Sequence, residues 1–187
     1  MVPSLSLWLP ILVSAVVVFI ASSVIHMALR YHKNDFKRLP TESDVLASLR
    51  SFQLPPGEYF FPFADGGEEM RSDEWKKKVD TGPVGFMTVM PNRPMDMGKN
   101  LTQWFVYCLV VGLLTAYLTG LAYGPGTDYM VIFRFAGTAA FIGYTAAMWQ
   151  NSIWWSRSWS TTLKSTFDGL VYGLLTAGVF GWMWPGA

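Results

Sequence analysis

Four apolar stretches dominate this chain and restrict what it can fold into. They cover residues 7–29, 101–123 and 129–149, with a shorter stretch at 169–184. A helix needs about 20 mostly apolar residues to cross the hydrocarbon core of a bilayer. Lipid cannot hydrogen-bond an open backbone, so segments inside it must be helical. The sequence therefore predicts an all-α integral membrane protein with four transmembrane helices.

The stretches divide the chain into three regions. Residues 1–30 form an N-terminal transmembrane helix, residues 31–99 form a hydrated segment, and residues 100–187 form a three-helix membrane region. The sequence Gly124-Pro125-Gly126 predicts a tight turn between the second and third helices. Those two helices are therefore expected to be antiparallel neighbours.

Positive charge predicts the orientation. Eleven of the 14 Lys and Arg residues lie between Arg30 and Lys99, and none precedes residue 30. Positive residues that flank membrane helices are retained in the cytoplasm. We expect a bacterial-type inner membrane location, with both termini outside and residues 31–99 in the cytoplasm. The first helix lacks a basic leader, so we expect it to be retained.

The hydrated segment is predicted to form an ordered cap against the cytoplasmic ends of the helices. Thr41 and Ser72 each resemble a helix start, and Gly82-Pro83 closes the second helix. The proline-rich, aromatic run 54–63 is expected to be extended, and residues 86–90 resemble a short strand.

An internal repeat suggests a duplicated two-helix unit. Gly112-Leu-Leu-Thr-Ala116 in the second stretch recurs as Gly173-Leu-Leu-Thr-Ala177 in the fourth. Chance is the alternative, because membrane helices reuse these residue types.

Small residues recur every four positions, which aligns them on one face of a helix. They are Gly112, Ala116 and Gly120 in the second stretch, and Gly169, Gly173, Ala177 and Gly181 in the fourth. Such faces let helix backbones approach closely. They pack either the chain's own helices, which we favour, or a partner subunit.

Aromatic residues gather beside the third helix. They are Trp149, Trp154, Trp155 and Trp159, and Arg157 lies among them. Tryptophan favours the headgroup zone, so we expect a membrane-interface belt and a short interfacial helix at 151–162. A ring-lined site for a quinone, pigment or lipid tail is the alternative.

Two histidines are the candidate ligand residues. His26 lies inside the first span and is a candidate for cofactor binding, while His32 with Asp35 is a weaker candidate for a metal site. On a continuous helix, His26 and His32 would point away from each other. The sequence therefore requires no cofactor, and none is identified.

Arg134 is the one basic residue predicted inside a span, near the outer surface, and Asp128 precedes it. It is a candidate for an outer-side contact, either by reaching outward or by pairing with Asp128. Few other charges fall within the spans, which disfavours proton-coupled transport.

These features favour a non-enzymatic accessory or scaffold subunit of a larger inner-membrane complex, such as a respiratory or photosynthetic one. Expected partners are the lipid bilayer and other membrane subunits. The net charge of +1 gives no basis for nucleic-acid binding. The alternative is a membrane-embedded small-ligand protein, either a lipid-type enzyme or a pigment, haem or quinone binder, that uses His26 and the tryptophan cluster.

Overall fold

The computed structural model describes residues 1–186 and has two compact units. One unit consists of Met1–Phe36 with Asp96–Ala187, and the other of Lys37–Met95. The helices of the first unit are α1 (Trp8–Met27), α5 (Met97–Ala122), α6 (Tyr129–Thr145), α7 (Trp149–Trp154) and α8 (Trp159–Trp182), with 3-10 turns at Ser4–Leu7, Arg30–His32 and Ala146–Met148.

Three helical segments of the described chain are long and apolar enough to cross a membrane. They are Ser4–Met27, Met97–Ala122 and Tyr129–Trp154. To this extent the prediction of a helical membrane protein is confirmed. The helix α8 has 24 residues, but it begins at Trp159 rather than near Gly169. Its early turns therefore carry polar side chains that the predicted fourth stretch did not include.

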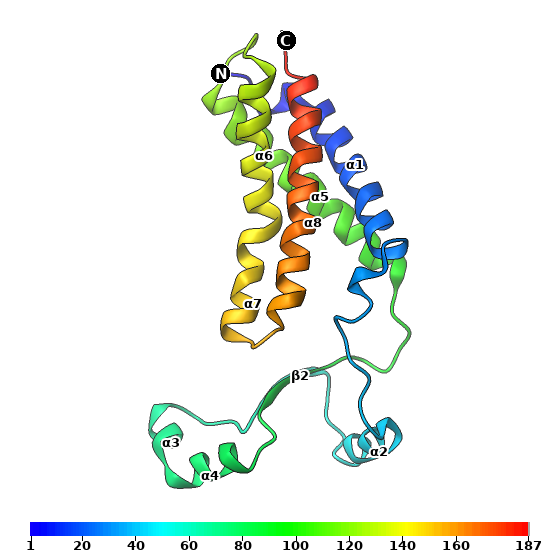
Figure 1. The fold of residues 1–187 in the computed structure, drawn as a ribbon, viewed down its shortest axis with the longest axis vertical. Coiled ribbons are helices and arrows are strands. Elements are labelled where there is room, and N and C mark those ends of the chain that lie inside the picture. The colour runs from blue at the N-terminus through cyan, green and yellow to red at the C-terminus, as the bar shows by residue number, and fades with distance from the viewer. Residues whose placement is uncertain (187) are drawn as a thin grey trace. The chain divides into compact units, whose positions relative to one another are not determined.

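The four long helices form a bundle (Figure 1). The helix α1 packs against α5 and α8, and α6 packs against the same two helices. One buried apolar cluster includes Val18, Cys108 and Tyr144. A second, which includes Leu7 and Phe180, lies at the end that carries the chain termini.

The small-residue faces of α5 and α8 are occupied within the chain. A methyl group at Gly112 would lie 3.3 Å from Ile11 of α1, and one at Gly173 would lie 3.1 Å from Phe141 of α6. The two copies of the repeat thus place their glycines against the preceding long helix in each pair. Duplication itself stays a prediction.

Backbone hydrogen bonds close the bundle at one end, where the N- and C-termini both lie (Figure 1). The Val2 N–H donates to the Gly120 carbonyl over 2.8 Å, and the Gly126 N–H donates to the Pro185 carbonyl over 2.8 Å. Trp184, which is 3% exposed, donates its indole N–H to the Gly124 carbonyl. This tryptophan is therefore a packed residue of the bundle and not part of an exposed belt.

The second unit contains the predicted elements of the hydrated segment, so the chain is not entirely helical. Its elements are α2 (Glu42–Ser51), β1 (Gly57–Phe61), α3 (Gly67–Arg71), α4 (Asp73–Thr81) and β2 (Gly85–Val89). The strands pair antiparallel, with Tyr59 opposite Met87. The Ser72 hydroxyl accepts a hydrogen bond from Trp75 N–H, as expected of a helix start. The predicted contact of this segment with the membrane helices stays a prediction.

The predicted interfacial helix at 151–162 is wrong. The helix α7 ends at Trp154, the chain turns at Ser156 with a positive φ of 51°, and α8 begins at Trp159. The turn occurs because the Arg157 N–H and Trp155 N–H both donate back to the Asn151 carbonyl, which ends the helix there.

Candidate functional site

A chain reversal at the end of α1 brings the two histidines together. The N–H groups of Ala28 and Leu29 both donate to the Val24 carbonyl, and Leu29 then adopts an extended conformation. The imidazole rings of His26 and His32 stack with their centroids 4.9 Å apart and their planes 5° from parallel. The expectation that these rings point apart is wrong, because it assumed a helix that continues past Met27.

The His32 ring lies between two carboxylates. Its Nδ1 is 2.6 Å from Asp35 Oδ2, and its Nε2 is 2.8 Å from Asp168 Oδ2 on α8. A neutral imidazole donates through only one nitrogen, so with both carboxylates ionised the two bonds form together only on a protonated ring. His32 and Asp35 therefore meet as predicted, but Asp168 joins them from the far end of the chain.

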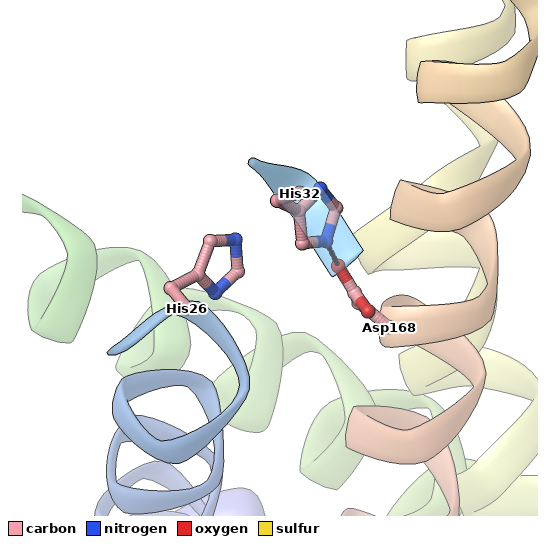
Figure 2. Close-up of side chains that lie close together, drawn as sticks. All are labelled: His26, His32 and Asp168. Carbon is pink, nitrogen blue, oxygen red and sulfur yellow. Dashed lines mark hydrogen bonds and ion pairs between the residues drawn. The ribbon is translucent and has the colours of Figure 1, made fainter. Parts of the chain in front are cut away.

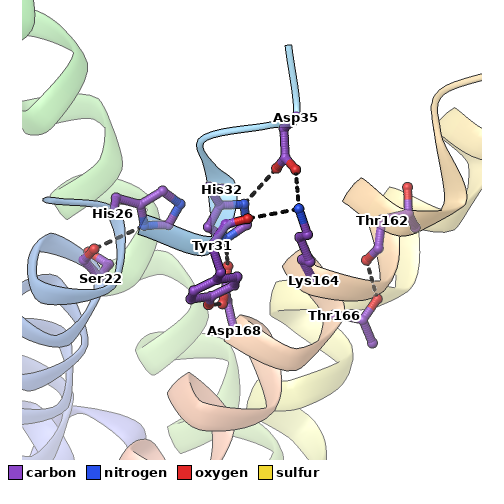
Figure 3. A network of polar contacts seen from close by, with 9 residues as sticks. All are labelled: Ser22, His26, Tyr31, His32, Asp35, Thr162, Lys164, Thr166 and Asp168. Carbon is purple, nitrogen blue, oxygen red and sulfur yellow. Dashed lines mark hydrogen bonds and ion pairs between the residues drawn. The ribbon is translucent and has the colours of Figure 1, made fainter. Parts of the chain in front are cut away.

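Lys164, a residue of α8, holds the loop that follows α1, residues 28–36, against that helix (Figure 3). Lys164 Nζ donates to Asp35 Oδ1 over 2.7 Å and to the Tyr31 carbonyl over 2.8 Å. Burial of Asp35 would by itself raise the pKa of its carboxyl, but hydrogen bonds from Lys164 and His32 hold that pKa below its ordinary value. The Asp35 carboxylate is thus held in its charged form.

Asp168 completes the network from one helical turn further along α8. Residues four apart on a helix share a face, so Lys164 and Asp168 point at the same loop. The Tyr31 hydroxyl and His32 both donate to the Asp168 carboxylate. Asp168 is 3% exposed, and these hydrogen bonds offset the free-energy cost of burying its carboxylate.

His26 has a different environment. Its Nδ1 is 2.9 Å from the Ser22 carbonyl, one turn back on α1. A carbonyl can only accept, so Nδ1 carries a proton, and in the neutral ring the lone pair lies on Nε2. The Nε2 atom of His26 is thus available as an acceptor or a metal ligand.

A cavity of about 630 Å³ lies between α1, α5, α6 and α8, beside this network. Its lining is mostly apolar and aromatic, and it includes both His26 and Asp168. The residues around it are Phe19, Ser22, Ser23, His26, Met27, Met97, Leu101, Trp104, Tyr107, Tyr144, Met148, Ser165, Asp168, Gly169 and Tyr172.

Hydrogen bonds hold two aromatic residues of the cavity wall, and one buried hydroxyl of the wall has no such bond among residues 1–186. The Trp104 indole N–H donates to the Ser22 hydroxyl over 2.8 Å, and the Tyr107 hydroxyl donates to the Gly143 carbonyl over 2.6 Å. The Tyr172 hydroxyl is buried and has no hydrogen-bond partner among residues 1–186. Buried polar groups are rarely left unpaired, so this hydroxyl is a candidate contact for a ligand.

None of the tryptophans of the predicted belt lines this cavity. Trp149 packs edge-to-face on Trp159 and donates to the Thr166 hydroxyl over 3.0 Å. Trp154 is 72% exposed, in keeping with a position at a membrane surface. His26 and the tryptophan cluster are therefore separate features, and Trp104 supplies the indole next to His26.

Arg134 and Asp128 do not form the ion pair that was one of two expectations for them. The Asp128 carboxylate accepts a hydrogen bond from Met130 N–H and caps α6. Arg134 lies exposed on the outer side of α6, and within residues 1–186 its guanidinium has no acidic partner.

Three residues of the network escaped the sequence analysis. Tyr31, Lys164 and Asp168 were not identified as site residues, because Lys164 and Asp168 lie more than 120 residues from His32 along the chain. One signal was present. An acid directly before an apolar stretch, with a lysine four residues earlier, is an unusual pair at the edge of a membrane helix.

Comparisons of the chain with protein-family models, with curated proteins and with solved structures found no match.

Proposed function

We propose that this protein binds an amphipathic small molecule, such as a quinone or another lipid-like compound, in the cavity beside His26 and Asp168. The observation that carries the proposal is the cavity itself, an aromatic space of about 630 Å³ with polar groups at one side. Small-molecule sites typically have volumes of about 300–1,000 Å³, mostly apolar walls and a few placed polar groups.

The polarity of the cavity indicates how the ligand lies. The His26 Nε2 accepts, the Tyr172 hydroxyl can donate, and Asp168 draws protons or cations. A carbonyl or hydroxyl head group fits these atoms, while the rings of Phe19 and Trp104 contact an apolar body. The ligand therefore lies with its head toward the histidines and its tail between the helices.

The proposal includes a membrane topology of four spans, with both termini outside a bacterial cytoplasmic membrane. Support comes from the positive charges between Arg30 and Lys99 and from α8, whose second half is apolar. In this topology the histidine network lies at the cytoplasmic surface.

Thiol labelling in whole cells tests the topology. With the sole cysteine removed (Cys108→Ala), single cysteines are introduced at Ser6 and at Asp44, both of which are exposed. We expect a membrane-impermeant maleimide to label Ser6→Cys in intact cells and Asp44→Cys only after permeabilisation. Labelling of Asp44→Cys in intact cells would overturn the orientation.

Ligand occupancy tests the binding function. We expect native mass spectrometry of protein extracted in mild detergent to show one small molecule per chain. Ser23→Trp fills the cavity and should reduce this occupancy to below about a tenth of the wild-type value.

The matched control is Ile20→Trp, one turn earlier on α1. Ile20 is 57% exposed and does not line the cavity, so its occupancy should equal that of the wild type. Equal occupancy in both variants, or no bound compound beyond bulk lipid, would count against a ligand site here.

A second candidate function is that of an accessory subunit in a larger membrane complex, such as an energy-transducing one. The observation that favours it is Arg134, whose guanidinium has no acidic partner in residues 1–186 although it lies in α6, about 8 Å along the helix from its start. An arginine at this depth either reaches outward to the lipid head groups or pairs with an acidic group, which a partner helix would supply in such a complex. The native mass from the same extraction tests it: a reproducible complex with named partners supports a subunit, and a lone chain argues against one.

A further inference from the structure

Two imidazoles and one carboxylate converge beside the cavity (Figure 2). One ligand atom from each of His26, His32 and Asp168 lies within 4.8 Å of the others. They come from the end of α1, the turn that follows it, and α8. Three different segments thus place nitrogen and oxygen donors within 4.8 Å of one another.

We infer that His26, His32 and Asp168 bind one divalent first-row transition-metal ion, with an open coordination position toward the cavity. Imidazole ligands favour ions such as Zn²⁺ or Fe²⁺ over Mg²⁺ and Ca²⁺, which prefer oxygen. Two nitrogens and one carboxylate with a vacant position are typical of a catalytic rather than a structural metal site. This inference goes beyond ligand binding in the cavity and does not depend on it.

The hydrogen-bond partners of the two histidines support the inference independently. Each histidine is oriented through Nδ1, His26 by the Ser22 carbonyl at 2.9 Å and His32 by the Asp35 carboxylate at 2.6 Å. Metal-binding histidines usually donate their other N–H to a carbonyl or carboxylate in this way, which leaves Nε2 to coordinate. The Nε2 atoms of both rings are thus left to coordinate, and that of His32 already lies 2.8 Å from Asp168.

The charges of the cluster also suit a cation. Lys164 neutralises Asp35, so the Asp168 carboxylate is balanced only by the proton on His32. When an ion binds, the His32 Nε2 proton is released to solvent, and the ion takes its place between that nitrogen and Asp168. The His32 Nδ1–H bond to Asp35 is retained in this exchange.

Binding requires the ligands to move and one ring to turn. Ligand atoms around tetrahedral Zn²⁺ lie about 3.4 Å apart, so the His32 Nε2 and Asp168 Oδ2 atoms, now 2.8 Å apart, must separate slightly, and the His26 donor must approach them by up to about 1.4 Å. The His26 ring, which is stacked on His32, must also rotate, because an imidazole nitrogen binds an ion that lies in the plane of its ring. His26 can supply this movement because its side chain is exposed and its one hydrogen bond is to its own helix. The turn that carries His32 is held firmly by Lys164.

Metal titration of the full chain tests this site. The protein is produced without a polyhistidine tag, stripped with a chelator, and titrated with Zn²⁺ by calorimetry and with Co²⁺ by absorption spectroscopy. We expect one ion per chain and a Co²⁺ spectrum of mixed nitrogen and oxygen coordination. His26→Ala should weaken metal binding by at least about 100-fold. Mutation of a residue that only hydrogen-bonds to a metal ligand already lowers metal affinity by about 10–100-fold, and His26→Ala removes a ligand itself.

His26→Ala is the decisive variant, because His26 is exposed and its loss leaves the Lys164 network intact. Asp168→Asn should also abolish binding, with thermal unfolding measured to verify that the bundle remains folded. Asp128→Asn is the matched control, since Asp128 caps α6 and asparagine is an equally good cap. Absence of stoichiometric binding in the wild type, or an affinity that His26→Ala leaves unchanged, would overturn the site.

Discussion

Lys164→Met is expected to lower the free energy of unfolding of the helical bundle by about 2–3 kcal/mol. The substitution keeps the length and the apolar stem of the side chain but removes its charge. Asp35, whose side chain is only 8% exposed, then loses its lysine partner and keeps only its hydrogen bond with His32. Removal of one partner from a buried charge is strongly destabilising, and the remaining His32 contact and the partial exposure of Lys164 moderate the loss.

Unfolding in a detergent titration measures this effect. Lys99→Met is the matched control, since Lys99 is exposed and forms no ion pair within the described residues. The double variant Lys164→Met with Asp35→Asn should recover part of the loss, because it removes the buried charge that Lys164 had balanced. If Lys164→Met unfolds like the wild type, the network does not hold the loop to α8.

Gly120→Ala is expected to destabilise the bundle by about 2 kcal/mol, through overpacking. A methyl group at Gly120 would overlap the Val2 carbonyl oxygen, which is a backbone atom and cannot rotate away. The N-terminal segment must therefore move, and the Val2 N–H loses its bond to the Gly120 carbonyl. Leu7, which is fully buried beside this contact, becomes exposed to lipid.

Gly178→Ala is the control for this prediction. A methyl group there meets no atom within 4 Å, so it should leave stability unchanged or raise it by a few tenths of a kcal/mol through better helix propensity. Thermal unfolding followed by circular dichroism distinguishes the two variants. Equal unfolding temperatures would mean that the N-terminal segment does not pack on α5 as described.

The polar network and the cavity are adjacent and share Asp168. Asp168 and His26 line the cavity, while Tyr31 and Lys164 hold the turn that brings His32 beside them. Tyr31 and Lys164 thus control the position of one proposed metal ligand, although neither of them lines the cavity. Lys164→Met should therefore also weaken metal binding at the proposed site, whereas Gly120→Ala, at the opposite end of the bundle, should not.

The sequence by itself determined the helical segments, because hydropathy and capping are local properties. The first three apolar stretches, the helix that starts after Ser72 and the strand near residues 86–90 all appear where their patterns predict them. The start of α8 was missed because its early turns are polar, and side-chain composition alone does not distinguish a polar helical turn from a loop.

Only the tertiary structure decided the site. Spacing along a helix cannot reveal that the chain leaves α1 after Met27 and folds back, so the stacking of His26 on His32 was not predictable from their separation of six residues. Asp168 and Lys164 reach this point because α8 packs against α1, and that packing depends on contacts distributed over whole helices. His26, His32 and Asp35 were identified from the sequence, but their meeting with Lys164 and Asp168 depends on long-range packing.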